Sequence, residues 1–198
     1  MIKFSKSLIK DIETLIKQGA VGVIPTDTIY GIVCSALNKK SVERVYKIRK
    51  RNPLKPVIIL IGSLNDLKLF NIEIDKEKKI LQSLWPDKIS IVLNCSYKKF
   101  EYLHRGTKAL AFRMPKDKDL ISLLKATGPL IVPSANLEGK KPARDIKEAQ
   151  KYFKKEVDFY IDSGTLKSEP STIISLINGK IKIIRKGSIK IKNYEKHC

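Results

Sequence analysis

The sequence contains few of the residues that build disulfide frameworks or metal centres. Its cysteines, Cys34, Cys95 and Cys198, are far apart and form no C-x-x-C pair, which argues against a disulfide framework or a zinc cluster. The histidines, His104 and His197, are also distant from each other, so a histidine-based metal site or catalytic triad is not expected. This cysteine usage is typical of a protein that works in a reducing cytoplasm.

Long apolar segments are lacking as well. The amino-terminal MIKFSKSLIKDIETLIKQG carries charges every few positions, whereas a signal peptide or membrane span needs an uninterrupted apolar stretch. The chain has no G-x-x-x-x-G-K-[ST], no G-x-G-x-x-G after a strand and no G-x-S-x-G. The P-loop, Rossmann and α/β-hydrolase folds therefore lack their signatures, and no membrane association is expected.

Acidic residues are in the minority. There are 20 Asp and Glu residues against 40 Lys and Arg residues, a formal net charge of +20. Such a surface attracts polyanions, so charge alone would admit nucleic acid, nucleotides and anionic membranes as partners, although the lysines could also serve only to solvate the surface. Of these, a membrane is not among the partners that we expect. With 198 residues, 42% of them hydrophobic, the chain is expected to form one domain over residues 1–198.

The hydrophobic pattern alternates between helices and strands. Helices are predicted at residues 5–18, 41–51, 75–85, 120–125 and 145–154, and strands at 21–24, 56–62, 89–93, 108–114, 130–132 and 157–161. Asn178-Gly179 joins two further β-rich segments, 171–177 and 180–185, and is a strong hairpin signal. This order favours one α/β domain with a mixed sheet. Cys34 and Trp85 are predicted to be core residues.

Three polar loops begin where a buried strand is predicted to end. They are Pro25-Thr26-Asp27-Thr28, Pro133-Ser134-Ala135-Asn136 and Asp162-Ser163-Gly164. Each alone would be interpreted as a turn or helix cap, and Asp27, Asp87 and Asp162 as cap or turn acids. Loops at strand ends also collect ligands in α/β sheets, so three of them together point to a shared pocket.

Basic side chains lie close to these loops. Arg49, Lys50, Arg51 and Lys55 form a cluster that suits nucleotide phosphates, with a solvated helix end as the alternative. Arg113 lies in the otherwise apolar LAFRMP strand, where a charge needs a partner or a ligand carboxylate unless the strand is an exposed edge. Arg185 in IKIIRKG presents the same choice.

A series of segments occurs in a characteristic order along the chain: GAVGVIPTDTIYGIVCSA, RKRNPLKPVIILI, LWPDKISIVL, LAFRMP, IVPSANLEGKKPA, VDFYIDSG, EPSTIISL and IIRKG. Together they resemble the YrdC family, the threonylcarbamoyl-AMP synthases of tRNA modification. The resemblance implies an α/β fold, with a YrdC-like twisted mixed parallel/antiparallel sheet flanked by helices around a large basic cavity. It also implies that L-threonine, bicarbonate or CO2, and ATP are condensed into threonylcarbamoyl-AMP and pyrophosphate. That product would serve N6-threonylcarbamoyladenosine modification of tRNA next to the anticodon.

The resemblance also implies roles for individual residues. Arg51 and Arg113 would be the catalytic cations, with Arg113 receiving the threonine carboxylate. The threonine site would comprise Thr28, Arg113, Val132 and Ser171, with Thr172 a weaker candidate. The ATP site would comprise Arg49, Lys50, Arg51, Lys55, Ser134, Asn136, Pro142 and Arg185. No protein metal site is expected; Mg2+ would accompany the triphosphate, held mainly by phosphate oxygens and water.

This sequence departs from the family pattern at several positions, and the residue roles implied near those positions stay open. Arg49 stands where Lys is usual, Asn52 replaces a customary Pro, WPDK replaces Trp-Pro-Gly-Pro, and Arg144 stands where Thr is common. The chain resembles the short single-domain form. Affinity for tRNA or double-stranded RNA and contact with downstream threonylcarbamoyl-transfer proteins are further expectations. Two alternatives are a non-catalytic RNA-binding module with a basic concave surface and a carbamoyl-transfer enzyme with another acceptor.

Overall fold

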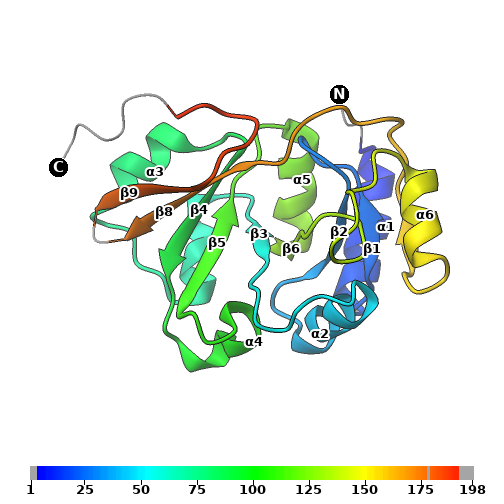
Figure 1. Ribbon diagram of the computed structural model, residues 1–198, viewed down its shortest axis with the longest axis horizontal. Helices are drawn as coiled ribbons and strands as arrows, with labels where there is room; N and C mark the ends of the chain where they lie inside the picture. The colour runs from blue at the N-terminus through cyan, green and yellow to red at the C-terminus, as the bar shows by residue number, and fades with distance from the viewer. Residues whose placement is uncertain (1–3, 178, 192–198) are drawn as a thin grey trace.

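The computed structural model describes residues 4–177 and 179–191 (Figure 1). Within them, one continuous sheet has the strand order β7-β1-β2-β6-β3-β5-β4-β8-β9. The strands are β1 (Gly22–Ile24), β2 (Gly31–Ser35), β3 (Ile58–Leu60), β4 (Ile89–Asn94), β5 (Ala109–Arg113), β6 (Leu130–Ile131), β7 (Phe159–Tyr160), β8 (Thr172–Ile177) and β9 (Lys180–Arg185).

The sheet mixes parallel and antiparallel pairs, as predicted. The pairs β1/β7, β3/β5 and β4/β8 are parallel, and the other neighbours are antiparallel. The register of the central pair places Leu60 of β3 opposite Arg113 of β5. The hairpin of β8 and β9 is confirmed by the pairing of Ile177 with Lys180, while its turn residue Asn178 lies outside the described residues. The predicted α/β fold class with a mixed sheet is therefore correct.

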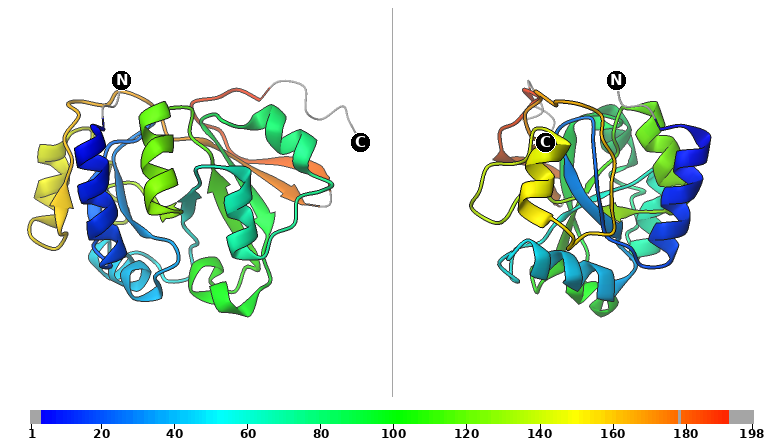
Figure 2. Two further views of the ribbon diagram at one scale, coloured as in Figure 1. Left: turned by 180° about the vertical axis from the view of Figure 1, so that it is seen from behind. Right: turned by 90° about the vertical axis from the view of Figure 1, so that its right-hand side faces the viewer.

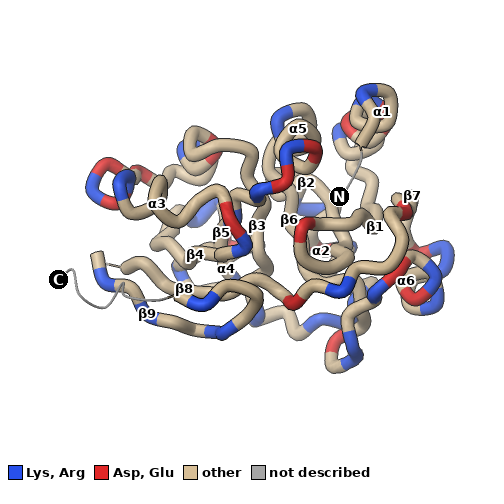
Figure 3. The backbone as a smooth tube through the Cα atoms, turned by 90° about the horizontal axis from the view of Figure 1, so that it is seen from above, with Lys and Arg blue, Asp and Glu red and all other residues tan. Residues whose placement is uncertain are grey.

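Helices cover the sheet on more than one side. They are α1 (Lys6–Lys17), α2 (Lys39–Ile48), α3 (Lys78–Leu84), α4 (Glu101–His104), α5 (Lys118–Thr127) and α6 (Ile146–Phe153), with 3-10 turns η1 (Leu64–Phe70) and η2 (Lys98–Phe100). Helices α1 and α5 pack against each other on one side, and α6 lies on the opposite side (Figure 2). The charged residues are spread over most elements (Figure 3), so Lys and Arg do not gather on one helix.

The amphipathic pattern explains how the outer helices attach. In α1 the apolar positions Ile12 and Ile16 are almost fully buried and belong to the same cluster as Leu120 and Leu124 of α5. Ser5 caps α1 by accepting a hydrogen bond from the Leu8 amide at 3.1 Å, which satisfies one of the free amides of the first turn. The apolar side of the sheet and its helices thus form the core, and the strand ends remain free to form a site.

Several predicted boundaries differ from the structure, and one of these differences affects the site. The helix predicted at 41–51 ends at Ile48, because Lys50 has φ +50° and cannot continue a right-handed helix. Arg51 therefore lies in a loop and not on a helix face. The helix predicted at 75–85 begins only at Lys78. The short helical segments at 98–104 were not predicted, since they are too short to show a periodic pattern.

The core predictions hold for the described residues. Cys34 is fully buried and Trp85 is 4% exposed. Ser63 forms a capping box with Asp66 at the start of η1. Cys198 and His197 lie outside the described residues. No helix within 4–177 and 179–191 combines the length and the apolar character that a bilayer crossing requires.

Candidate functional site

Residues at the ends of several strands and in the adjoining loops converge on one cavity of about 250 Å³. Its lining includes Thr28 after β1, Val132 and Ser134 after β6, Ser171 before β8, and the arginines Arg51, Arg113 and Arg185, together with Thr26, Ile29, Gly31, Pro56, Val57, Ile58, Pro133, Pro142, Pro170 and Ile173. The bridge between Gly31 and Ser134 holds two of these loops together. Two of the three predicted loops, those of residues 25–28 and 133–136, contribute to this lining, whereas Asp162, Ser163 and Gly164 are not among its residues.

Thr26 organises the loop after β1. Its hydroxyl donates to the Ile29 carbonyl at 2.6 Å and accepts the amides of Thr28 and Ile29, each at 3.2 Å. The Thr26 and Thr28 hydroxyls are 3.0 Å apart, and Thr28 is only 3% exposed. This turn positions Thr28 on the cavity wall. Sequence reasoning named Thr28 and missed the structural role of Thr26, although a threonine two residues before another in a turn is a detectable signal.

Arg113 is buried at the end of β5 and forms an ion pair with Asp27. The side chains of Arg113 and Asp27 are 3% and 6% exposed, and Arg113 Nη1 donates to Asp27 Oδ1. The expectation that Asp27 is a cap or turn acid is therefore wrong: it is the partner that the buried charge on the strand requires. Asp162 does form a turn, accepting the Gly164 amide at 2.9 Å.

Ser171 is held between two neighbours at the start of β8. Its hydroxyl lies 2.9 Å from that of buried Ser90, and its carbonyl accepts a hydrogen bond of 2.7 Å from Arg185 Nη2. Partial burial lowers the pKa of the Arg185 guanidinium below its usual value. Gly187 lies directly against this segment, where a Cβ would meet the carbonyl oxygens of Pro170 and Ser171, the latter at 2.6 Å.

We expect Gly187→Ala to displace the Ser171 segment, because the contact is with backbone and cannot be relieved by a side-chain rotation. Overpacking of this kind costs about 1–3 kcal/mol of unfolding free energy, measurable by urea denaturation. The same substitution should also weaken the binding of a ligand in the small cavity that contacts Ser171. Lys190→Ala, at an exposed position nearby, serves as the control and should change stability by less than about 0.5 kcal/mol. Equal stability of the two variants would contradict the close approach.

Arg49 and Asn136 form a buried brace beside the cavity and are not part of its lining. Arg49 is 2% exposed; its Nε donates to the Asn136 carbonyl at 3.0 Å, and its Nη2 donates to Asn136 Oδ1 at 3.1 Å and to Ser134 Oγ at 3.3 Å. The Asn136 amide nitrogen donates to the carbonyls of Leu137 and Lys140. Burial, followed by the charge of Arg51, lowers the pKa of Arg49 to about 10. The brace fixes the loop that presents Ser134.

We expect Arg49→Met to destabilise the protein by about 3 kcal/mol, since it leaves the acceptors of Asn136 buried without their charged donor. Arg49→Lys retains the charge but cannot span all three bonds, so its stability should be intermediate. Thermal unfolding monitored by circular dichroism measures both effects. Arg44→Lys is the matched control, because Arg44 forms an exposed ion pair with Asp158 (39% and 37% exposed side chains). Similar losses of stability in all three variants would contradict the structural role of Arg49.

The remaining predicted phosphate ligands occupy different positions. Arg51 lines the cavity and is folded onto its own loop, with Nη2 donating to the Pro56 carbonyl at 2.7 Å and Nε donating to the Lys55 carbonyl at 3.2 Å. Lys55 is outside the lining and pairs with Glu138 at 2.8 Å. This hydrogen bond from Lys55, followed by the Asn52 amide, lowers the pKa of Glu138. Lys50 is exposed.

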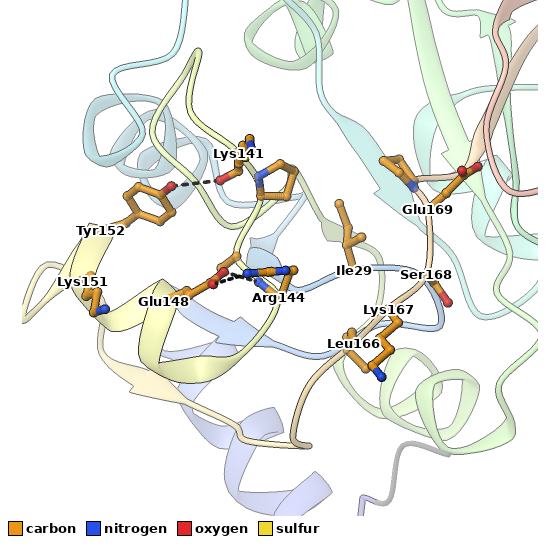
Figure 4. Close-up of a pocket in the computed structure, with 13 residues that line it drawn as sticks. Ile29, Lys141, Arg144, Glu148, Lys151, Tyr152, Leu166, Lys167, Ser168 and Glu169 are labelled. Atoms are coloured by element: carbon orange, nitrogen blue, oxygen red, sulfur yellow. Dashed lines mark hydrogen bonds and ion pairs between the residues drawn. The ribbon is translucent and has the colours of Figure 1, made fainter.

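A second cavity of about 700 Å³ adjoins the first and shares Ile29, Pro142 and Pro170 with it (Figure 4). Its walls carry Tyr152, whose hydroxyl donates to the Lys141 carbonyl at 3.0 Å. Arg144 and Glu148 form an ion pair of 3.2 Å on the same wall, and the 166–170 segment closes the opposite side. Of this larger cavity, the sequence analysis named only Pro142 as a site residue and noted Arg144 as a departure from the family pattern. Glu148, Lys151 and Tyr152 come from α6, and residues 166–170 from an extended segment, neither of which carries a motif.

The structure thus gathers some of the predicted site residues and separates others. The small cavity brings together Thr28, Arg51, Arg113, Val132, Ser134, Pro142, Ser171 and Arg185. Arg49, Lys50, Lys55, Asn136 and Thr172 are not among its lining residues. Within the part of the chain that the structure describes, no group of three His, Cys, Asp or Glu side chains could hold a metal ion.

The fold and the lining of this site together indicate the class of protein. Strand-end loops of a mixed α/β sheet enclose a small cavity lined by arginines and hydroxyls, which is the chemistry of a site for anionic small molecules. The chain belongs to the Sua5/YciO/YrdC family: the family model, described as telomere recombination, matches residues 14–187. The resemblance noted in the sequence is therefore confirmed.

Named relatives agree with this assignment. A Methanocaldococcus jannaschii protein that provisionally carries the name threonylcarbamoyl-AMP synthase is 34% identical over 94% of this chain and 89% of its own length. The threonylcarbamoyl-AMP synthase of Pseudoalteromonas translucida is 30% identical over 85% of this chain and 92% of its own. The crystal structure of P. abyssi Sua5 complexed with L-threonine matches with a TM-score of 0.81 and 28% identity, covering 88% of this chain and 52% of that one.

Proposed function

We propose that this protein is an L-threonylcarbamoyladenylate synthase, which condenses L-threonine, bicarbonate or CO2, and ATP. The observation that carries the proposal is the convergence of Arg51, Arg113 and Arg185 with Thr28 and Ser171 on one cavity. Relatives that carry the synthase name, and a related structure with L-threonine bound, support the same activity. The reaction makes this protein a transferase of the nucleotidyltransferase type, and its product would serve tRNA modification.

The chemistry requires anionic reactants to be brought together. The threonine amine adds to the carbon of CO2 and loses a proton, giving a carbamate. A carbamate oxygen then attacks the α-phosphorus of ATP, the bond from that phosphorus to the bridging oxygen breaks, and pyrophosphate leaves with the electron pair. The protein's contribution is to neutralise charge and to position the reactants. Arginine guanidinium groups and hydroxyls are suited to both tasks.

We assign the reactants to positions in the cavity as follows. Arg113 would bind the threonine carboxylate, with Thr28, Val132 and Ser171 around the amino acid. Arg51 and Arg185 would bind the phosphates with Ser134 and Pro142 alongside, and Lys55 would reach them by releasing Glu138. Lys50 would act from the exposed loop after α2, whereas Arg49 and Asn136 act by bracing the loop of Ser134.

The nucleoside half of ATP would extend into the larger cavity. Ligand pockets commonly have volumes of about 300–1,000 Å³, and the cavity of about 250 Å³ is small for an amino acid and a nucleoside triphosphate together. The lining of the adjoining cavity of about 700 Å³ includes the aromatic ring of Tyr152 and the apolar side chains of Pro142 and Leu166. Mg2+ would arrive with the triphosphate, coordinated by phosphate oxygens and water.

The test is to identify the product made by the purified protein from L-threonine, bicarbonate and ATP by mass spectrometry, with pyrophosphate release followed in parallel. We expect a threonylcarbamoyl-AMP mass and a release of pyrophosphate that requires threonine. Reactions with L-serine in place of threonine test for another acceptor. Threonine-independent ATP hydrolysis, or RNA binding without any pyrophosphate release, would refute the proposal in favour of the alternatives. The tRNA affinity, the downstream transfer proteins and a cytoplasmic location are parts of the same proposal.

A further inference from the structure

The arginines that line the small cavity differ in how their charge is compensated. Among the described residues, Arg51 donates only to the carbonyl oxygens of Lys55 and Pro56, and Arg185 donates only to that of Ser171. Arg113 alone pairs with a carboxylate, that of Asp27. Carbonyl dipoles leave a full positive charge at the first two positions, whereas the ion pair at the third is close to neutral.

The neutral pair is part of the buried wall and does not arise from a chance surface contact. The two side chains are 3% and 6% exposed, and the turn organised by Thr26 fixes the backbone on either side of Asp27. The pair makes one hydrogen bond, and within the described residues Arg113 Nε and Asp27 Oδ2 have no partner. Groups left unsatisfied in this way are rare in folded proteins and frequently have a functional role.

A fixed carboxylate beside one arginine has a large effect on a polyanion. Two charges in hydrogen-bonding proximity interact strongly in the wall of a protein cavity, where the effective dielectric constant is well below that of water. A pyrophosphate group at Arg113 would meet this repulsion with several negative charges. A zwitterionic amino acid would meet it with no net charge, because its ammonium group offsets its carboxylate. The pair therefore discriminates against phosphates without excluding an amino acid.

We propose that Asp27 divides this basic cavity into two sub-sites, because it neutralises Arg113 and leaves Arg51 and Arg185 as free cations. The zwitterionic amino acid is accepted at Arg113, and the polyphosphate is directed to the other two arginines. Asp27 is then a specificity-determining residue that acts through Arg113. The inference rests on the proposed function for the identity of the two ligands, and it explains how one small cavity can keep an amino acid and a polyphosphate in separate places.

The test measures the binding of inorganic pyrophosphate by calorimetry in the absence of turnover. Asp27→Asn should bind pyrophosphate at least about tenfold more tightly than the unmodified protein, and pyrophosphate should become a competitor of L-threonine. Asp158→Asn is the matched control, since it makes the same change of net charge at an ion pair with Arg44 outside the cavity. The control should leave pyrophosphate affinity unchanged, and Asp27→Asn combined with Arg113→Met should lose the gain.

Further variants keep the inference testable if Asp27→Asn does not fold. Arg113→Met alone is not informative, because it leaves the Asp27 carboxylate without its counter-charge. Asp27→Asn combined with Arg113→Met replaces a neutral pair by two uncharged side chains and should leave the affinity for pyrophosphate within about twofold of the unmodified protein. A tenfold loss in the double variant, or unchanged pyrophosphate affinity in folded Asp27→Asn, would overturn the inference. These binding measurements do not depend on product formation. A failure of the proposed function would appear in a different experiment, as the absence of threonine-dependent turnover.

Discussion

Arg113→Ala is expected to reduce threonine-dependent release of pyrophosphate by about 10²–10³-fold, the range seen when one preorganised group that stabilises charge is removed from an active site. The physical reason is the position of Arg113 at the end of β5, where the guanidinium faces the small cavity and is held by Asp27. A bidentate contact to a carboxylate has no substitute among the neighbouring hydroxyls. The requirement for threonine should rise more than the requirement for ATP.

The same substitution should also destabilise the fold. Removing one partner of a buried ion pair leaves an uncompensated charge, which costs about 3–5 kcal/mol. The double variant Arg113→Ala with Asp27→Ala removes that charge and should recover much of the stability, while activity stays lost. Arg44→Ala, which breaks an exposed pair with Asp158, should cost no more than about 1 kcal/mol and retain full activity.

Steady-state kinetics and urea denaturation of the three variants separate the two effects. Recovery of activity together with stability in the double variant would show that Arg113 acts only in folding. Near-normal turnover in folded Arg113→Ala would remove it from the site altogether.

Arg51→Ala is expected to act on ATP, with a rate loss of about 10²-fold and a raised KM for ATP, because a cation that binds the transferring phosphates is removed. Its effect on stability should be only about 1 kcal/mol, since Arg51 is half-buried and its partners are the carbonyl oxygens of Lys55 and Pro56. A large kinetic effect with a small stability effect is therefore the signature of this residue.

The control for Arg51 is Lys47→Ala, which removes one exposed positive charge from the last turn of α2. It should change neither KM by more than about twofold, because an exposed charge outside the cavity is screened by salt. The KM values for threonine and ATP should be measured for both variants. If Arg51→Ala raised the KM for threonine and Arg113→Ala raised that for ATP, the two sub-sites would have to be exchanged.

The large elements could be predicted from the sequence because their signals are local. The apolar spacing of α1 and the continuous apolar run around β3 record burial directly in the order of residues. Boundaries were less accurate where one backbone angle decides them, as at Lys50 after α2. The 98–104 segment was missed because a single turn has too few residues for a period to show.

The candidate site was predicted in part. The loops after β1 and β6, and the arginines near strand ends, carried enough pattern to name Thr28, Ser134 and Arg113. Partnerships across the fold were not predictable. Arg49 was expected at the phosphates and is instead enclosed against Asn136, while Lys55 is paired with Glu138, 83 positions away. Local sequence contains no information on which side chain a charge meets after the chain has folded.

The sequence by itself determined the α/β class, the excess of positive charge and the membership of a family, because each is written in composition, periodicity or the order of motifs. Only the tertiary structure decided which cations stay free and which are neutralised. Asp27 and Arg113 are 86 positions apart and meet because the turn after β1 and the end of β5 lie at the same cavity. Electrostatic function depends on distances in space, and those distances exist only once the sheet has formed.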